Sequence, residues 1–170
     1  MLRSITVLAL LSVAVSAAAQ SPAPSPRVAL DVVGGYAGFI DESLIGHGVV
    51  SATARYQLTR RISIGPELVY MAGPGADRDL FLTGNMTVDF LVRPVGSRTG
   101  SVNPFLVVGG GVMRHSNRFG GGQSFSSVEG AWTGGAGARV WVAERIYAIG
   151  EYRVGWEPHA RVTGGIGVVW

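Results

Sequence analysis

A histidine and a serine stand side by side in residues 114–117 (Arg-His-Ser-Asn), and these residue types could act as base and nucleophile. Glu129, further along the chain, could complete a triad with them. In a β-strand, however, adjacent side chains point to opposite faces, so His115 and Ser116 would point apart. We therefore expect a polar loop end here and no catalytic site.

The three histidines, His47, His115 and His159, all fall outside the regular strand-like segments and toward one predicted end of the fold. Imidazole is a common metal ligand, so the three could converge on an ion. Asp77 and Asp79 follow a Gly-Pro-Gly turn and could hold Ca²⁺ weakly. Because these residues lack any metal-ligand spacing, we expect exposed loop side chains, with no metal and no cofactor.

The residue types that the chain lacks narrow its chemistry further. With no cysteine, thiol catalysis, cysteine-bound metals and a disulfide scaffold are all excluded. Lysine is absent too, and charged residues make up 15% of the chain, against about 25% in ordinary soluble domains. A net charge of +3, spread along the chain, predicts no nucleic-acid partner.

Charged residues alternate with apolar ones from Arg27 to Trp170, as they do where consecutive side chains of a strand point to opposite faces. One face is aliphatic, aromatic or glycine, and the other carries the charges. We expect the charged face to line a narrow barrel, where acids and arginines can neutralise one another. The predicted network consists of Asp31, Arg55, Glu67, Asp89, Glu129, Arg139, Arg145, Glu151 and Arg153.

Eight segments carry this strand pattern, at residues 27–39, 48–58, 61–72, 80–92, 104–113, 126–140, 145–155 and 161–170. The fifth is apolar on both faces, so its orientation stays open. No segment after residue 20 is apolar for long enough to form a transmembrane helix, yet mean hydropathy is positive. Together these observations predict an all-β fold, an eight-stranded antiparallel up-and-down transmembrane β-barrel.

Aromatic residues on the apolar faces fall near the strand ends, where membrane barrels carry interfacial girdles. Tyr36, Tyr70, Trp132 and Trp156 would lie near one rim, and Tyr56, Phe90 and Trp170 near the other. An even strand count places both termini on the periplasmic side. The connections 40–47, 73–79, 114–125 and 157–159 are then extracellular, and the turn 94–103 is long for the periplasmic side.

The N-terminal segment predicts export. Met1-Leu2-Arg3 supplies a positive charge, residues 5–15 form an apolar stretch, and three alanines at 17–19 fit a signal peptidase site. We therefore expect a signal peptide at 1–19, a Pro/Ser linker at 20–26 and a barrel at 27–170.

Several stretches carry a family resemblance: Asn-Pro-Phe at 103–105 before a glycine-rich strand, residues 134–139 entering a short turn, and residues 145–147 and 151–153. With its C-terminal aromatic residue, the chain resembles the small eight-stranded OmpA/OmpX-like outer-membrane β-barrel family. This resemblance implies outer-membrane lipid and lipopolysaccharide as surroundings. It also implies a final strand that the barrel assembly machinery reads, through Val162, Ile166, Val168 and Trp170.

The predicted function is that of a non-enzymatic protein of the bacterial outer membrane, with a structural or surface-interaction role. Because side chains fill the interior of an eight-stranded barrel, porin activity is not expected. One alternative is a hydrolase, because residues 115–117 are similar to the His-x-Ser-Asn stretch of lipid A deacylases. In this chain, however, no residue separates the histidine from the serine. Another is a soluble periplasmic lipocalin-like barrel, with its apolar face inward.

Overall fold

The computed structural model describes residues 28–41, 43–91, 99–118, 123–157 and 159–170. The predicted signal peptide and linker, and part of the turn predicted at 94–103, lie outside these residues. No helix in the described part of the chain is both long and apolar enough to cross a membrane.

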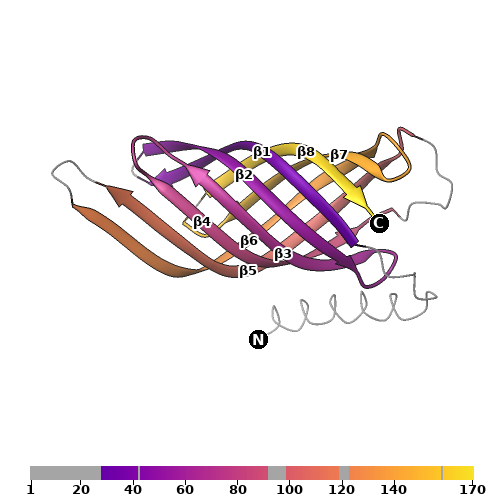
Figure 1. Cartoon of the computed structure of the whole chain (residues 1–170), viewed down its shortest axis with the longest axis horizontal. Coiled ribbons are helices and arrows are strands. Elements are labelled where there is room, and N and C mark those ends of the chain that lie inside the picture. Colours follow the sequence, from indigo (N-terminus) through magenta and orange to yellow (C-terminus); the bar gives the residue numbers. More distant parts are fainter. Residues whose placement is uncertain (1–27, 42, 92–98, 119–122, 158) are drawn as a thin grey trace, which may run out of the picture.

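Eight antiparallel strands form one closed barrel, in which each strand pairs with the next and β8 returns to β1 (Figure 1). The strands are β1 (Val28–Asp41), β2 (Ser43–Gln57), β3 (Ile62–Ala72), β4 (Arg78–Asp89), β5 (Val102–Arg118), β6 (Ser124–Trp141), β7 (Ile146–Gly155) and β8 (His159–Val169). The predicted fold class is confirmed. Val28 and Val169 lie at the same end of the barrel, which we call the terminal end, and strands β5 and β6 extend furthest at the opposite end, the far end (Figure 1).

At the far end the strands are longer than predicted. The predicted connections at 40–47 and 114–125 were wrong in length, because β1 and β2 pair up to Asp41 and Ser43, and β5 and β6 pair up to Arg118 and Ser124. Both faces of β6 are exposed or half-buried where it begins. There the contrast between apolar and polar faces is lost while backbone pairing continues, so alternation cannot reveal the strand.

The register of the strands fixes the width of the barrel. Following paired positions around it from Ala29 leads back to β1 at Phe39, ten residues further along. This path runs through Arg55, Gly65, Asn85, Gly109, Thr133, Gly155 and His159. Its step from Arg55 to Gly65 follows from the register on either side, where Thr53 pairs with Glu67 and Tyr56 with Ile64. A stagger of this kind tilts the strands, and an eight-stranded barrel then has an interior that side chains just fill.

The apolar faces point outward and the charged faces inward. Val32, Leu82 and Ile166, for example, are each more than half exposed, whereas Asp31, Glu67 and Arg153 are buried. The structure also orients β5, whose Phe105 and Val107 are buried while Leu106 and Val108 face outward. This arrangement is the reverse of the soluble lipocalin-like alternative.

Candidate functional site

The interior of the barrel is the candidate site, and it is built in layers. An aromatic and ion-paired layer lies nearest the terminal end, followed by a second ion-paired layer around Glu67. An apolar layer comes next, and a group of histidine and aspartate side chains lies at the far end.

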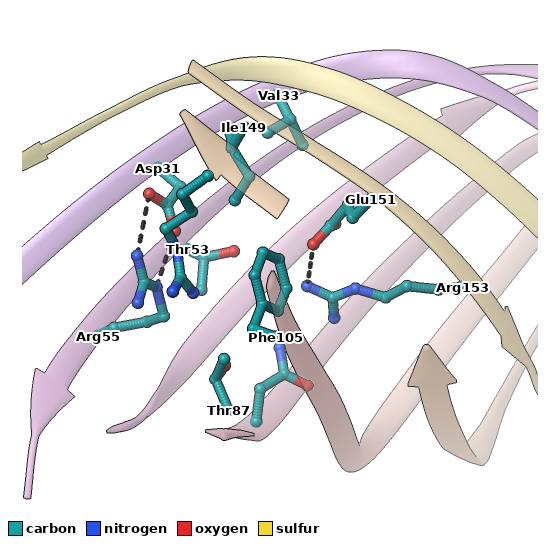
Figure 2. A pocket seen from close by; sticks show the side chains of 11 residues that line it. Asp31, Val33, Thr53, Arg55, Thr87, Phe105, Ile149, Glu151 and Arg153 are labelled. Atoms are coloured by element: carbon teal, nitrogen blue, oxygen red, sulfur yellow. Dashed lines mark hydrogen bonds and ion pairs between the residues drawn. The ribbon is translucent and has the colours of Figure 1, made fainter. Parts of the chain in front are cut away.

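The layer near the terminal end joins Asp31 on β1 to Arg55 on β2 (Figure 2). Arg55 Nε donates to Asp31 Oδ2 over 2.8 Å, and Tyr147 on β7 donates its hydroxyl hydrogen to the other carboxylate oxygen. Arg139 pairs with Asp89, and its guanidinium lies 4.1 Å from the centre of the Phe105 ring. With two acids and two arginines, this layer has no net charge.

The second layer is centred on Glu67, of which 1% is exposed. Arg153 Nη1 donates to Oε2 over 2.8 Å, and Arg161 Nη2 donates to Oε1 over 2.7 Å. Asn85, Ser51 and Thr83 also donate hydrogen bonds to the carboxylate. Arg153 also pairs with Glu151, so this layer is neutral as well.

Side chains close the path through the barrel. The cavity between the two ion-paired layers, beside Phe105, has a volume of about 10 Å³, which is about the least that holds one water molecule. Between the second layer and the far end lies the apolar layer of Ala37, Phe39, Val49, Val69, Met71, Phe81, Met113 and Ala131. The interior therefore offers no open channel along the described strands.

Seven of the nine residues predicted for the network lie buried inside, and two do not. Arg145 is exposed in the turn before β7, because the strand begins one residue later. Glu129 is half-buried near the far end, where it accepts a hydrogen bond from Trp156 Nε1 over 3.3 Å. Sequence reasoning missed Arg161 and Tyr147, although both share the inward parity of their strands and could have been found from it.

The possible catalytic residues are not brought together. His115 Nδ1 lies 2.6 Å from Asp79 Oδ1, whereas Ser116 donates to the backbone carbonyl of Arg78 over 3.2 Å. Glu129 contacts Trp156 instead of either residue. Because no hydrogen bond joins any two of these three described side chains, they do not form a nucleophile with its base.

The histidines differ most from expectation. His47 and His159 are 3% and 4% exposed, so the prediction of exposed loop side chains was wrong for both. It was wrong for Asp79 too, which is 2% exposed on β4. The extended far-end strands hold them over the apolar layer, where the Phe39 ring lies 4.6 Å from His47 and 5.0 Å from His159. His47 Nε2 lies 3.0 Å from Asp77 Oδ2 and 3.5 Å from Asp79 Oδ2.

The exterior carries the predicted aromatic residues at two levels. The ten-residue stagger is spread over eight strands. From one strand to the next, paired positions therefore move along the barrel axis by just over one residue, and we call the resulting height of a residue its level. On that basis four aromatics lie at nearly one level toward the far end, and three lie near the terminal end. All seven are exposed: Tyr36, Tyr70, Trp132 and Trp156, and Tyr56, Phe90 and Trp170.

The final strand presents the predicted assembly residues outward. Val162, Ile166 and Trp170 are each about 60% exposed. Val168 is half-buried on the same strand, and the Trp170 backbone donates to Val28 over 2.9 Å.

The fold and filled interior define the class of small closed β-barrels with an apolar exterior. Two similar solved structures are the N-terminal barrel domain of Pseudomonas aeruginosa OprF, with a TM-score of 0.66, and Neisserial surface protein A, with 0.67. Each is 14% identical to this chain, and the alignments cover 85% and 87% of it and 97% and 99% of the respective relative. The resemblance to small outer-membrane barrels is thus confirmed for the fold.

A third similar structure is Ail, the attachment invasion locus protein of Yersinia pestis, in complex with the heparin analogue sucrose octasulfate. It is 12% identical, with a TM-score of 0.53 over 85% of this chain and 97% of that one. No protein-family model matches the chain, and no curated protein matches it in sequence.

Proposed function

We propose that this protein is a non-enzymatic barrel of the bacterial outer membrane with a structural or surface-interaction role. The observation that carries the proposal is the inverted arrangement of the barrel, with aliphatic and aromatic side chains outside and paired arginines inside. Lipid hydrocarbon favours apolar side chains on the outside. In a closed barrel the strands also satisfy one another's backbone hydrogen-bonding groups, which is required within a membrane. The predicted signal peptide at 1–19 would export the chain, and the assembly machinery would insert it by way of β8.

Membrane insertion is tested by fractionation and gel mobility. The protein is expected to stay with the membranes during carbonate extraction, and to migrate differently on a gel with and without boiling, because a closed barrel resists detergent. Release into the carbonate wash, or the same mobility in both samples, would contradict the proposal.

The orientation is tested with introduced cysteines, since the natural chain has none. The proposal places the far end outside the cell, so Ala76→Cys in the β3–β4 turn should react with an impermeant maleimide on intact cells. The matched variant Arg60→Cys, in the β2–β3 turn at the terminal end, should react only after lysis. The opposite result would reverse the orientation.

Lipopolysaccharide is the proposed surface contact. Arg78 and Arg114 line a groove at the far end together with Ser116, Asn117 and Phe125. Arginine suits phosphate recognition because of its planar set of donors. Replacing both arginines by glutamine should weaken retention of lipopolysaccharide by the purified barrel, whereas Arg60→Gln at the other end should not. Equal retention by all three proteins would remove the support for this contact.

The non-enzymatic reading rests on the separation of His115, Ser116 and Glu129. Lipid A from cells with and without the gene should therefore show the same acylation by mass spectrometry. An acyl chain that is removed by the natural protein but retained with Ser116→Ala would overturn it.

A further inference from the structure

The carboxylates at the far end are paired differently from those in the rest of the interior. Asp31, Glu67, Asp89 and Glu151 each pair with an arginine. Asp77 and Asp79 pair with imidazoles instead, and no arginine side chain forms an ion pair with either of them in the described part of the chain. With neutral histidines, the group carries two uncompensated negative charges.

Burial makes this charge significant. Asp79 is 2% exposed and His47 is 3% exposed, and the apolar layer lies directly beneath them. Asp77 Oδ1 is also buried and has no hydrogen-bond partner among the described residues. A buried carboxylate without a positive partner is strongly unfavourable, so this group favours uptake of a proton or a cation.

The donor atoms lie close enough together to share one metal ion. His47 Nε2, one oxygen of Asp77 and one of Asp79 all lie within 4.8 Å of one another. Ligands about 2.0–2.1 Å from a tetrahedral Zn²⁺ are about 3.3 Å apart. The separations of 3.0 Å from His47 to Asp77 and 3.5 Å from His47 to Asp79 fall on either side of that value.

His115 occupies the position of a supporting residue. Its Nδ1 lies 2.6 Å from Asp79 Oδ1, so Asp79 contacts His47 with one carboxylate oxygen and His115 with the other. Hydrogen bonds of this kind orient the carboxylates that bind metals.

We propose that His47, Asp77 and Asp79 bind one Zn²⁺ or a similar transition-metal dication at the far mouth of the barrel, with His115 positioning Asp79. The imidazole ligand favours a transition metal over Ca²⁺ and Mg²⁺, which prefer oxygen ligands throughout. The bound ion would join β2 to β4 and the preceding turn, next to β5. This site is independent of the proposed membrane function, since it needs only the folded barrel.

The test is a titration of the whole purified chain, refolded in detergent, with Zn²⁺ in competition with a chromogenic chelator. One Zn²⁺ should bind per chain, and the barrel should unfold at a higher temperature in its presence. A wild-type protein that leaves Zn²⁺ on the chelator would overturn the proposal. So would equally strong binding of Ca²⁺, because the imidazole would then have no role in the selectivity.

Variants assign the ligands. Asp77→Asn, in the β3–β4 turn, and His47→Gln should each weaken Zn²⁺ binding by more than about 100-fold, a larger effect than the loss of an outer partner. Glu129→Gln, a matched change near the same end but outside the group, should bind as the wild type does. Unchanged affinity for Zn²⁺ in Asp77→Asn would overturn the assignment. If His47→Gln does not regain the gel mobility of a folded barrel, the result for Asp77→Asn alone tests the ligand assignment.

The role assigned to His115 has its own readout. His115→Gln should weaken binding by about 10–100-fold. With Co²⁺ in place of Zn²⁺, this variant should keep the visible absorption spectrum of the wild-type complex, because the three ligands remain. A changed spectrum would make His115 a ligand and overturn its positioning role.

Discussion

Arg161 on β8 reaches across the interior to Glu67 on β3, where Nη2 lies 2.7 Å from Oε1. The two residues are far apart in the sequence, and their strands are not neighbours in the barrel. Because the other carboxylate oxygen of Glu67 accepts from Arg153 on β7, one side chain connects three strands. The charged network therefore ties together walls that backbone pairing joins only through intervening strands.

Arg161→Met is expected to lower the free energy of unfolding by about 3–5 kcal/mol, because it removes one member of a buried ion pair and leaves the other members with excess negative charge. Urea unfolding of the barrel in lipid or detergent measures the change. Arg145→Met removes an arginine from the exposed turn before β7, and should change the free energy by less than about 0.5 kcal/mol. Equal losses in the two variants would show that the ion pair contributes nothing beyond a general charge effect.

The fold could be predicted from the sequence because alternation is strong wherever one strand face meets an apolar environment and the other a polar one. From this contrast, the inward-facing positions of Asp31, Arg55 and Glu67 could be predicted. It failed for Arg145, which lies one residue before β7, and alternation does not define where a strand begins. The orientation of β5 needed the register with β4 and β6, since both of its faces are apolar.

The histidine and aspartate group at the far end could not have been predicted from alternation alone. His47 and Asp79 lie on β2 and β4, which are not adjacent in the barrel, and Asp77 lies in a turn. Their side chains meet because β2 and β4 continue past the aromatic level that lies toward the far end. Without the strand registers, the sequence does not show that these side chains meet.

The layered interior predicts that the barrel does not conduct ions. Two ion-paired layers and an apolar layer fill the described part of the lumen, and the cavity beside Phe105 holds about 10 Å³. The protein reconstituted in planar bilayers should show no steady conductance under conditions in which a large porin, used as a positive control, gives regular steps. Reproducible steps from the wild-type protein would mean that the interior opens in a membrane.

The proposed lipid contact of the outer face predicts a strong effect of charge at Ile166, which is 61% exposed on β8 between the two aromatic levels. Ile166→Arg should lower the free energy of unfolding in lipid bilayers by about 2–4 kcal/mol, the range for arginine near the middle of a membrane. Ile166→Leu, which keeps the side chain apolar, serves as the matched control and should have little effect. An arginine that is tolerated as well as leucine would indicate water at this surface.

Two adjacent glycines on β8 should respond very differently to alanine, because they face opposite sides of the sheet. A Cβ on Gly165 would lie 2.1 Å from the Val32 backbone oxygen on β1, whereas one on Gly164 would meet nothing closer than 3.7 Å. Gly165→Ala must push β8 away from β1, so it should lower the free energy of unfolding by about 1–3 kcal/mol.

Gly164→Ala points outward and should leave the free energy of unfolding within about 0.5 kcal/mol of the wild-type value. Urea titrations of the two variants in the same lipid, with gel mobility as the check for closure, compare them directly. If both alanines were tolerated equally, β8 would have room on its inner side. The close contact between β1 and β8, where the first and last strands close the barrel, would then be looser than the register indicates.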